Sequence, residues 1–206
     1  MAGLFISFEG GECSGKTTLI KALEKYYLDK GLEVVTTREP GGTPIAEQIR
    51  NVILDNNNVN MTSKCEALLY AASRIQHVEE KILPALKAGK LVLCDRFIDS
   101  SLAYQGYARD LGFDLVLEAN KFVLNYLPKL TIFVDVKSEI ALKRMSSRPD
   151  KVNRFDALSL DFHNKVYEGY QKLLEMYSDR IKRIDGTKAK EEVVKDAINL
   201  IDTYLE

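Results

Sequence analysis

One stretch of residues, placed between a short apolar run and a helical pattern, constrains the fold of this chain more than any other feature. Residues 10–17 read Gly-Gly-Glu-Cys-Ser-Gly-Lys-Thr, which fits the pattern G-x-x-x-x-G-K-[ST]. Gly10 and Gly15 lack a Cβ, so the loop can turn sharply and present backbone N–H groups to a polyphosphate. Lys16 adds a charge for the β- and γ-phosphates, and the Thr17 hydroxyl suits Mg²⁺. The sequence therefore predicts a P-loop that binds a nucleoside triphosphate through Gly10, Gly11, Glu12, Cys13, Ser14, Gly15, Lys16 and Thr17.

Apolar runs alternate with helical patterns along the whole chain. Strands are predicted near residues 4–8, 33–37, 91–94, 130–136 and 181–184. Helices are predicted from residue 18 onward, over 44–54, from 62 or 63 to 87, near 100–109, near 115–126, over about 160–177 and at the C-terminal end. Strands that alternate with helices and lack period-two polarity imply a parallel sheet covered on both faces. We therefore expect residues 1–206 to form a single α/β domain.

Residues typical of ligand-binding sites directly follow three of these predicted strands. Besides the P-loop, these are residues 38–42 (Arg-Glu-Pro-Gly-Gly) and the pair Asp95-Arg96. Ligands of parallel α/β sheets collect outside the carboxyl ends of the strands. Asp95 directly follows an apolar run, where a carboxylate could hold Mg²⁺ directly or through water. The alternative is an ordinary charge at a strand end, and the nearby P-loop favours the metal-binding interpretation.

A second concentration of charge lies between residues 143 and 156, with Pro149 in its middle. A charge run is usually a solvated face. Beside a P-loop, arginines on a loop could instead close over the triphosphate and exclude water. We expect a lid over about residues 144–156, in which Arg148 is the first candidate for a catalytic arginine and Arg154 the second.

Composition limits the partners and the compartment. The net charge of -1 offers no general attraction to nucleic acid or to acidic membranes, and no apolar run approaches the length of a membrane span. The chain has 3 cysteines, far apart and without metal-ligand spacing. Their odd number and the absence of an N-terminal targeting pattern favour a cytoplasmic protein with reduced thiols.

Several motifs together resemble the bacterial thymidylate kinase family over almost the whole length. They are the P-loop, residues 37–42 (Thr-Arg-Glu-Pro-Gly-Gly), residues 69–74 (Leu-Tyr-Ala-Ala-Ser-Arg) and residues 95–106 (Asp-Arg-Phe-Ile-Asp-Ser-Ser-Leu-Ala-Tyr-Gln-Gly). The resemblance implies a P-loop nucleoside monophosphate kinase fold with a five-stranded parallel sheet. It also implies transfer of the γ-phosphoryl group of ATP to dTMP, with Mg²⁺, by a homodimer.

The resemblance further implies roles for individual residues. Tyr70 should stack on the thymine ring, Arg74 should hydrogen-bond the base edge, and Ser101 and Gln105 should complete the base contacts. Arg50 and Arg96 should hold the 5′-phosphate, while Glu39 and Asp95 should lie near the metal and the acceptor. Tyr104 should crowd the 2′ position, and Glu12 should approach the sugar. The expected catalytic residues are Glu12, Lys16, Asp95, Arg96 and Arg148.

Two positions depart from the family's usual residues. Tyr70 stands where phenylalanine is common, which keeps an aromatic platform and adds a hydroxyl that needs a partner. Cys13 stands where glycine is common, so the sequence alone does not define the backbone conformation of the loop at this position. An aromatic residue at position 70 could also be ordinary core. Arg74 follows it at i+4 on the same helix face, however, and a ring beside a fork of donors suits a flat base with polar edges.

Two other functions remain open from the sequence. The P-loop and the lid do not identify an acceptor, so a kinase for another nucleoside monophosphate is the nearer alternative. A non-catalytic P-loop nucleotide switch is the more distant one. The Asn/Thr-Lys-x-Asp motif with which many such switches read guanine is absent.

Overall fold

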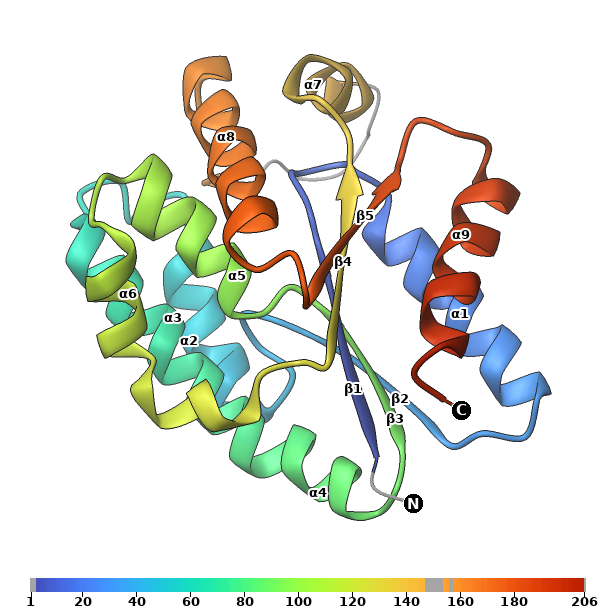
Figure 1. The fold of residues 1–206 in the computed structure, drawn as a ribbon. Coiled ribbons are helices and arrows are strands. Elements are labelled where there is room, and N and C mark those ends of the chain that lie inside the picture. The colour runs from blue at the N-terminus through green and yellow to red at the C-terminus, as the bar shows by residue number, and fades with distance from the viewer. Residues whose placement is uncertain (1–2, 147–153, 156–157, 206) are drawn as a thin grey trace.

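A parallel five-stranded sheet forms the centre of the molecule (Figure 1). The computed structural model describes residues 3–146, 154–155 and 158–205 of the chain. The strands are β1 (Leu4–Glu9), β2 (Val34–Arg38), β3 (Leu91–Asp95), β4 (Leu130–Asp135) and β5 (Ile181–Asp185). Their order is β2-β3-β1-β4-β5, and every pair is parallel. The predicted parallel sheet is confirmed.

Helices cover both faces of this sheet. The α-helices are α1 (Lys16–Asp29), α2 (Pro44–Leu54), α3 (Ser63–His77), α4 (Leu83–Lys87), α5 (Ile98–Ser101), α6 (Phe113–Ala119), α7 (Ser138–Ser146), α8 (Leu160–Met176) and α9 (Lys190–Asp202). Two π-helical segments, η1 (Val78–Ile82) and η2 (Leu102–Ala108), and a 3-10 segment, η3 (Lys121–Tyr126), continue some of them. Helices α1 and α9 lie on one face, and α3 to α6 with α8 lie on the other (Figure 1).

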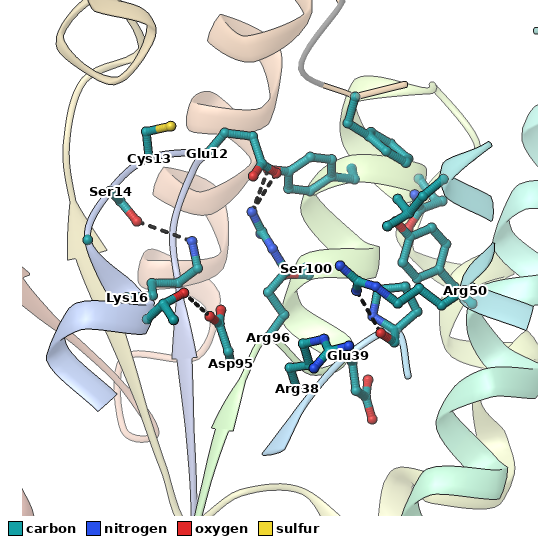
Figure 2. Close-up of a pocket in the computed structure, with 18 of the residues that line it drawn as sticks. Glu12, Cys13, Ser14, Lys16, Arg38, Glu39, Arg50, Asp95, Arg96 and Ser100 are labelled. Atoms are coloured by element: carbon teal, nitrogen blue, oxygen red, sulfur yellow. Dashed lines mark hydrogen bonds and ion pairs between the residues drawn. The ribbon is translucent and has the colours of Figure 1, made fainter. Parts of the chain in front are cut away.

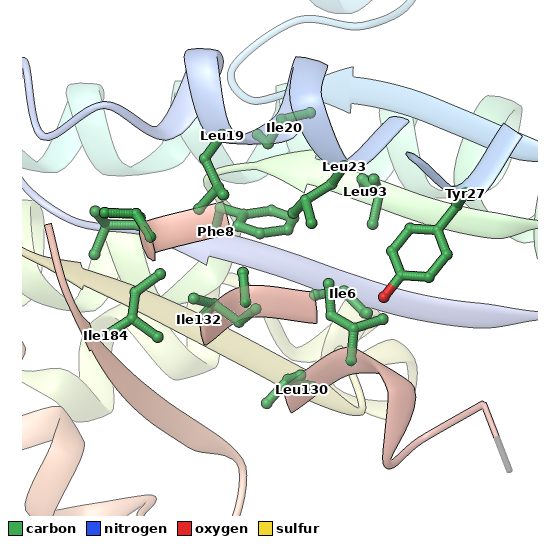
Figure 3. Close-up of a cluster of buried hydrophobic side chains, with 14 of the residues drawn as sticks. Ile6, Phe8, Leu19, Ile20, Leu23, Tyr27, Leu93, Leu130, Ile132 and Ile184 are labelled. Atoms are coloured by element: carbon green, nitrogen blue, oxygen red, sulfur yellow. The ribbon is translucent and has the colours of Figure 1, made fainter. Parts of the chain in front are cut away.

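The side chains of β1 divide between the two faces because successive residues of a strand point to opposite sides. Ile6 and Phe8 pack with Leu23 of α1 in a fully buried apolar cluster between the sheet and helices α1 and α9 (Figure 3). Phe5 belongs to a second apolar cluster on the opposite face. Glu9 follows Phe5 on that second face, at the end of the strand. Strand β1 therefore carries apolar packing through the sheet and ends in a buried carboxylate.

The helix predicted near residues 100–109 changes its hydrogen-bonding pattern along its length. It begins as α5 at Ile98 and continues as the π-helical η2 to Ala108. This stretch packs against α8, where Gly169 lets the two backbones approach. A Cβ at Gly169 would lie 3.1 Å from the Cα of Ala103. Side-chain periodicity predicted the presence of the helix, but not the widened turns.

The strand order brings together the ends of the three strands that are followed by candidate ligand-binding residues. β1 ends at the P-loop, β3 ends at Asp95, and β2 ends at Arg38. In the parallel register Phe8 is paired with Asp95, and Asp95 is paired with Arg38. Because β3 lies between β1 and β2, the groups predicted to bind the triphosphate and those predicted to bind the acceptor lie at the same carboxyl-terminal end of the sheet.

Helix α1 offers a matched test of the core under the P-loop. Leu23 has 0% of its surface exposed, whereas Leu28 on the same helix has 50% exposed. We expect Leu23→Ala to lower the free energy of unfolding by about 2–5 kcal/mol, because it leaves a cavity in the cluster of Figure 3. Leu28→Ala should change it by no more than about 0.5 kcal/mol. Urea unfolding of both variants measures the difference, and equal losses would contradict this picture of the core.

Candidate active site

The P-loop wraps around the ammonium group of Lys16. Lys16 Nζ donates hydrogen bonds to Gly10 O at 3.1 Å and to Gly11 O at 2.9 Å. It also donates to Ser14 Oγ at 3.2 Å (Figure 2). Burial lowers the pKa of Lys16 below its ordinary value. Gly10 has a φ of 142°, and a Cβ there would lie 2.7 Å from Val134 O. The first glycine of the motif is thus required by both its backbone angle and the neighbouring strand.

Two further loop residues adopt the left-handed region. Gly15 has a φ of 100° and caps α1, which begins at Lys16. Cys13 has a φ of 55°, an angle that costs a residue with a Cβ about 1–2 kcal/mol. This angle explains why glycine suits position 13 and how the loop closes with cysteine there. The N-terminus of α1 directly follows the loop, a favourable place for phosphate.

Of the three residues predicted near the metal, Thr17 and Asp95 lie in direct contact, whereas the carboxylate oxygens of Glu39 are bonded to Arg74 and His77. The Thr17 hydroxyl donates a 2.9 Å hydrogen bond to Asp95 Oδ2 (Figure 2). Within the described residues there is no group of three or more His, Cys, Asp or Glu side chains arranged to hold a metal ion. Mg²⁺ in phosphoryl-transfer sites is held by one or two protein oxygens, with phosphates and waters completing its shell. One hydroxyl and one carboxylate at the P-loop fit that requirement.

Arg96 lies at the centre of the site. Its φ of 69° is left-handed, and its backbone N–H donates to Phe8 O at 2.9 Å, which fixes it to the end of β1. Its Nη2 donates to Glu12 Oε1 at 2.6 Å and to the Tyr104 hydroxyl at 3.1 Å. Its Nη1 has three acceptors: Gly10 O at 3.0 Å, Ser100 Oγ at 3.1 Å and the Tyr170 hydroxyl at 3.2 Å.

This arrangement also sets the charge of Glu12. Burial would raise the pKa of its carboxyl, but the positive charges of Arg96 and Lys16 hold it below its ordinary value. The Tyr104 hydroxyl donates a further hydrogen bond to Glu12 at 3.0 Å. Glu12 therefore carries a negative charge between the P-loop and Arg96 near neutral pH (Figure 2).

A cavity of about 230 Å³ extends from the P-loop to helices α2 and α3. Arginines from three elements line it: Arg38 at the end of β2, Arg50 on α2 and Arg96 after β3 (Figure 2). Burial, with Arg38 nearby, lowers the pKa of Arg50. Tyr70 and Gln105 also line the cavity. The cavity thus has a phosphate-binding loop at one end, arginines along its side and an aromatic residue with an amide beyond them.

Arg74 and Ser101 lie behind the cavity wall. Arg74 is 1% exposed, and its guanidinium donates to Glu39 Oε2 at 2.7 Å and to Asn120 Oδ1 at 2.7 Å. It also donates to Ser101 Oγ at 3.0 Å. The other oxygen of Glu39 is bonded to the ring of His77 at 3.0 Å. Within the protein, Arg74 orders the wall that carries Tyr70, and its predicted contact with a base stays a prediction.

The structure describes only part of the expected lid. Arg148 lies outside the described residues, so its predicted role stays a prediction. The Arg154 guanidinium donates to Glu66 Oε2 at 2.6 Å and to Ile53 O at 3.0 Å. Its neighbour Phe155 meets Tyr70 edge to face, with ring centroids 6.2 Å apart. Arg154 therefore attaches this end of the segment to α2 and α3, and its predicted contact with ATP stays a prediction.

Sequence reasoning assigned no role to several residues that border this site. They are Arg38, Ser100 and Phe155, which line the cavity, and Glu66, which holds Arg154. A signal existed for Arg38 and Ser100, which lie inside the conspicuous stretches 37–42 and 95–106. Glu66 precedes Tyr70 by four residues, and that spacing could have placed it on the same helix face. No pattern in the sequence distinguished Phe155.

The fold and the site together define a P-loop nucleoside monophosphate kinase. The family model described as thymidylate kinase matches residues 8–197. A thymidylate kinase of Clostridium novyi is 53% identical over 94% of this chain and 96% of its own length. A thymidylate kinase of Bacillus velezensis is 52% identical over 100% of this chain and 98% of its own length. This chain belongs to the thymidylate kinase family.

A solved structure agrees with the sequence comparisons. The crystal structure of a thymidylate kinase from Ehrlichia chaffeensis superposes with a TM-score of 0.79 and 30% identity. The match covers 98% of this chain and 99% of that one. The predicted family and fold class are confirmed.

Beneath Arg96 lies a second buried carboxylate, Glu9. It accepts hydrogen bonds from Phe97 N at 2.7 Å, Ser100 Oγ at 2.6 Å and the Tyr170 hydroxyl at 2.8 Å. Burial, followed by the negative charge of Asp99, raises the pKa of Glu9 to about 7. Folded protein therefore keeps a proton on Glu9 at pH values where the unfolded chain has lost it.

This raised pKa predicts how stability depends on pH. Between pH 4.5 and about 7 the folded state binds the extra proton, so the contribution of Glu9 to stability falls as the pH rises through that window. Glu9→Gln cannot ionise, so it should become more stable relative to wild type between about pH 5 and about pH 8, by on the order of 1–3 kcal/mol. Urea unfolding at both pH values checks this. A difference that stays constant with pH would contradict the assignment.

The different environments of the three cysteines predict different rates of alkylation. Cys13 is partly exposed beside Lys16 and just before a helix N-terminus, a setting that favours thiolate. We expect iodoacetamide to label Cys13 faster than the exposed Cys65, and ATP to slow labelling at Cys13 alone. Cys94 is buried, and burial raises the pKa of its thiol, so it should react only after unfolding. Peptide mass spectrometry measures all three rates, and equal ATP effects on Cys13 and Cys65 would contradict the prediction.

Proposed function

We propose that this chain transfers the γ-phosphoryl group of ATP to dTMP, the reaction of the family, within the cavity of Figure 2. The observation that carries the proposal is that one cavity joins a P-loop to a group of arginines and an aromatic side chain. ATP and Mg²⁺ would occupy the P-loop end, and dTMP the end near Tyr70. The product pair is dTDP and ADP, and the reaction belongs to nucleotide biosynthesis.

On the ATP side, the loop and the first turn of α1 would hold the phosphates. Lys16 already occupies the middle of the loop, and its three present acceptors can be exchanged for β- and γ-phosphate oxygens. The Thr17 hydroxyl and the Asp95 carboxylate would hold Mg²⁺, with Glu39 near the acceptor. The ion would neutralise charge on the phosphates during transfer.

On the dTMP side, Arg50 and Arg96 would bind the 5′-phosphate, because both guanidinium groups line the cavity. Tyr70 would stack on the base, while Gln105, with Arg74 and Ser101 behind it, would read the base edge. Burial raises the pKa of the Tyr70 hydroxyl, so this platform stays neutral. Tyr104, fixed by Glu12 and Arg96, would fill the space beside the 2′ carbon.

Catalysis would then rest on position and charge. The dTMP phosphate oxygen would attack the γ-phosphorus in line, without a covalent enzyme intermediate. Lys16, Arg96 and Arg148, with Arg154 as the second lid candidate, would compensate the negative charge of the transferring group. Glu12 would orient Arg96 through their 2.6 Å ion pair.

We further propose a cytoplasmic homodimer of single-domain chains, with a lid over about residues 144–156. No helix in the described ranges is long and apolar enough to cross a membrane. Apolar side chains on α2, α3 and η3 lie exposed, among them Val52, Leu68 and Phe122, and a second copy would cover them. Sedimentation equilibrium of wild type and of Phe122→Ser tests this: a monomeric wild type contradicts the proposed dimer.

An assay of ADP release across dTMP, dUMP, dCMP and dGMP tests the proposed reaction. We expect dTMP to be the best acceptor in the presence of Mg²⁺. A preference for another monophosphate would favour the alternative of a kinase with a different acceptor. Nucleotide-dependent conformational change without any phosphorylated acceptor would favour the nucleotide switch.

Lys16→Ala tests the anchoring of the triphosphate. Removing this charge should lower kcat by about a hundredfold to a thousandfold, because Lys16 would contact the group whose charge grows in the transition state. Lys165→Ala is the matched control, since that lysine lies on α8, away from the cavity, and forms an exposed ion pair with Asp110. Its kcat should stay within about twofold of wild type. Near-normal turnover by Lys16→Ala would remove the P-loop from the mechanism.

A further inference from the structure

Only one of the two polar atoms in the Gln105 side-chain amide has a hydrogen-bond partner. This residue of η2 is 1% exposed and lines the cavity near Tyr70. Its Nε2 donates to Glu66 Oε1 at 2.9 Å, whereas its Oε1 has no hydrogen-bond partner within the described part of the chain. A buried acceptor left without a donor is costly, so few are kept without a reason. An unsatisfied acceptor in the wall of a ligand cavity indicates a donor on the ligand.

The contact with Glu66 determines which atom of the Gln105 amide lacks a hydrogen-bond partner. Glu66 on α3 is 1% exposed and is paired with Arg154 at 2.6 Å and with Arg109 at 3.3 Å. Facing two guanidinium groups, which are donors only, the oxygens of Glu66 accept hydrogen bonds. They must therefore face the NH₂ group of Gln105, because the opposite orientation would bring two acceptors together. The amide oxygen is the end left without a partner, on a residue that lines the cavity.

The position of the oxygen suits one kind of base edge. Glu66 precedes Tyr70 by one helical turn, so the residue that orients Gln105 and the proposed stacking platform share one face of α3. Thymine and uracil carry an N–H donor at N3, flanked by two carbonyls. Cytosine carries a lone pair at N3 and an amino group at C4. An amide oxygen attracts the first pattern and repels the second at N3.

We propose that Glu66 is a positioning residue for acceptor specificity. By holding the amide of Gln105 in one orientation, it presents an acceptor to the N3–H group of thymine and disfavours bases with a lone pair there. This inference rests on the proposed placement of dTMP with its base beside Tyr70 and Gln105. It adds a residue that touches no substrate but sets the hydrogen-bonding character of one that would.

The test compares two acceptors of nearly the same shape, dTMP and 5-methyl-dCMP. Both carry the 5-methyl group, and they differ at N3 and at C4. In Glu66→Gln the new amide can accept or donate, so Gln105 can turn either end to the base. We expect the ratio of kcat/KM for dTMP over 5-methyl-dCMP to fall by about tenfold or more, with the KM for ATP unchanged. Equal losses with both acceptors would overturn the proposal, because a merely structural role lowers both alike.

Two further variants keep the test decisive. Arg109→Gln removes one partner of Glu66 but leaves the Gln105 contact, so the ratio should stay at the wild-type value. The double variant Glu66→Gln with Gln105→Glu exchanges the donor and the acceptor of the pair. Residue 105 then again presents an oxygen to the cavity, and the dTMP preference should recover relative to Gln105→Glu alone, in which two carboxylates face each other. Failure to recover would overturn the proposal even where Glu66→Gln alone does not fold.

Gln105→Ala separates this inference from the proposed function. A raised KM for dTMP in Gln105→Ala, with an unchanged acceptor ratio in Glu66→Gln, would place the base at Gln105 and reject the role of Glu66. An unchanged KM for dTMP in Gln105→Ala would reject the proposed placement of the base, and with it this inference. If the wild-type chain does not phosphorylate dTMP, the proposed function itself is rejected.

Discussion

The site depends on one guanidinium group, that of Arg96, which is bound by acceptors from four parts of the fold. Gly10 and Glu12 belong to the P-loop, Ser100 to α5, Tyr104 to η2 and Tyr170 to α8. A planar guanidinium with fixed donors holds such a set in one geometry, whereas an ammonium group could rotate among them. Moving any of these elements would break at least one charge-assisted hydrogen bond. The ion pair between Arg96 and Glu12 therefore joins the P-loop to the helices that pack behind it.

The hydroxyl groups that bind Arg96 are themselves fixed deeper in the sheet. Glu9 accepts from the same Ser100 and Tyr170 hydroxyls that Arg96 uses, so the two hydroxyls lie between a buried carboxylate and a buried cation. Beside it, Asp99 is held by Arg180 through two hydrogen bonds of 2.6 and 2.7 Å. Buried ions are tolerated only when their hydrogen bonds are satisfied, and removing one partner leaves an uncompensated charge. Polar contacts thus hold the elements together at this end of the sheet, whereas the cluster behind α1 is apolar.

Strands β1, β3 and β4 could be predicted from the sequence almost residue by residue, because a buried parallel strand is a mostly apolar run bounded by turn residues. The edge strands β2 and β5 are only partly buried, and they were predicted from shorter apolar stretches. The helix at 44–54 was equally clear, since Pro44 favours a first helical position and the polar residues after Leu54 end it. The π-helical turns of η2 could not be predicted, because an apolar face does not distinguish the two hydrogen-bonding patterns. The helix predicted over 115–126 is divided at Asn120, whose side chain bonds Val116 O and Arg74. That division follows from a contact between distant segments, which local patterns do not contain.

The same limit applies to the site. A motif gives the residue types and the loop, but it does not say which polar groups are already occupied by other parts of the protein. The guanidinium group of Arg74 donates hydrogen bonds to Glu39, Asn120 and Ser101, whereas the amide oxygen of Gln105 has no partner among the described residues. Arg74 makes these contacts behind the cavity wall and so positions its neighbours, whereas the unpartnered oxygen of the buried Gln105 indicates where a ligand group belongs. The distinction between residues that shape the acceptor pocket and residues that read the base follows from this distribution of hydrogen bonds.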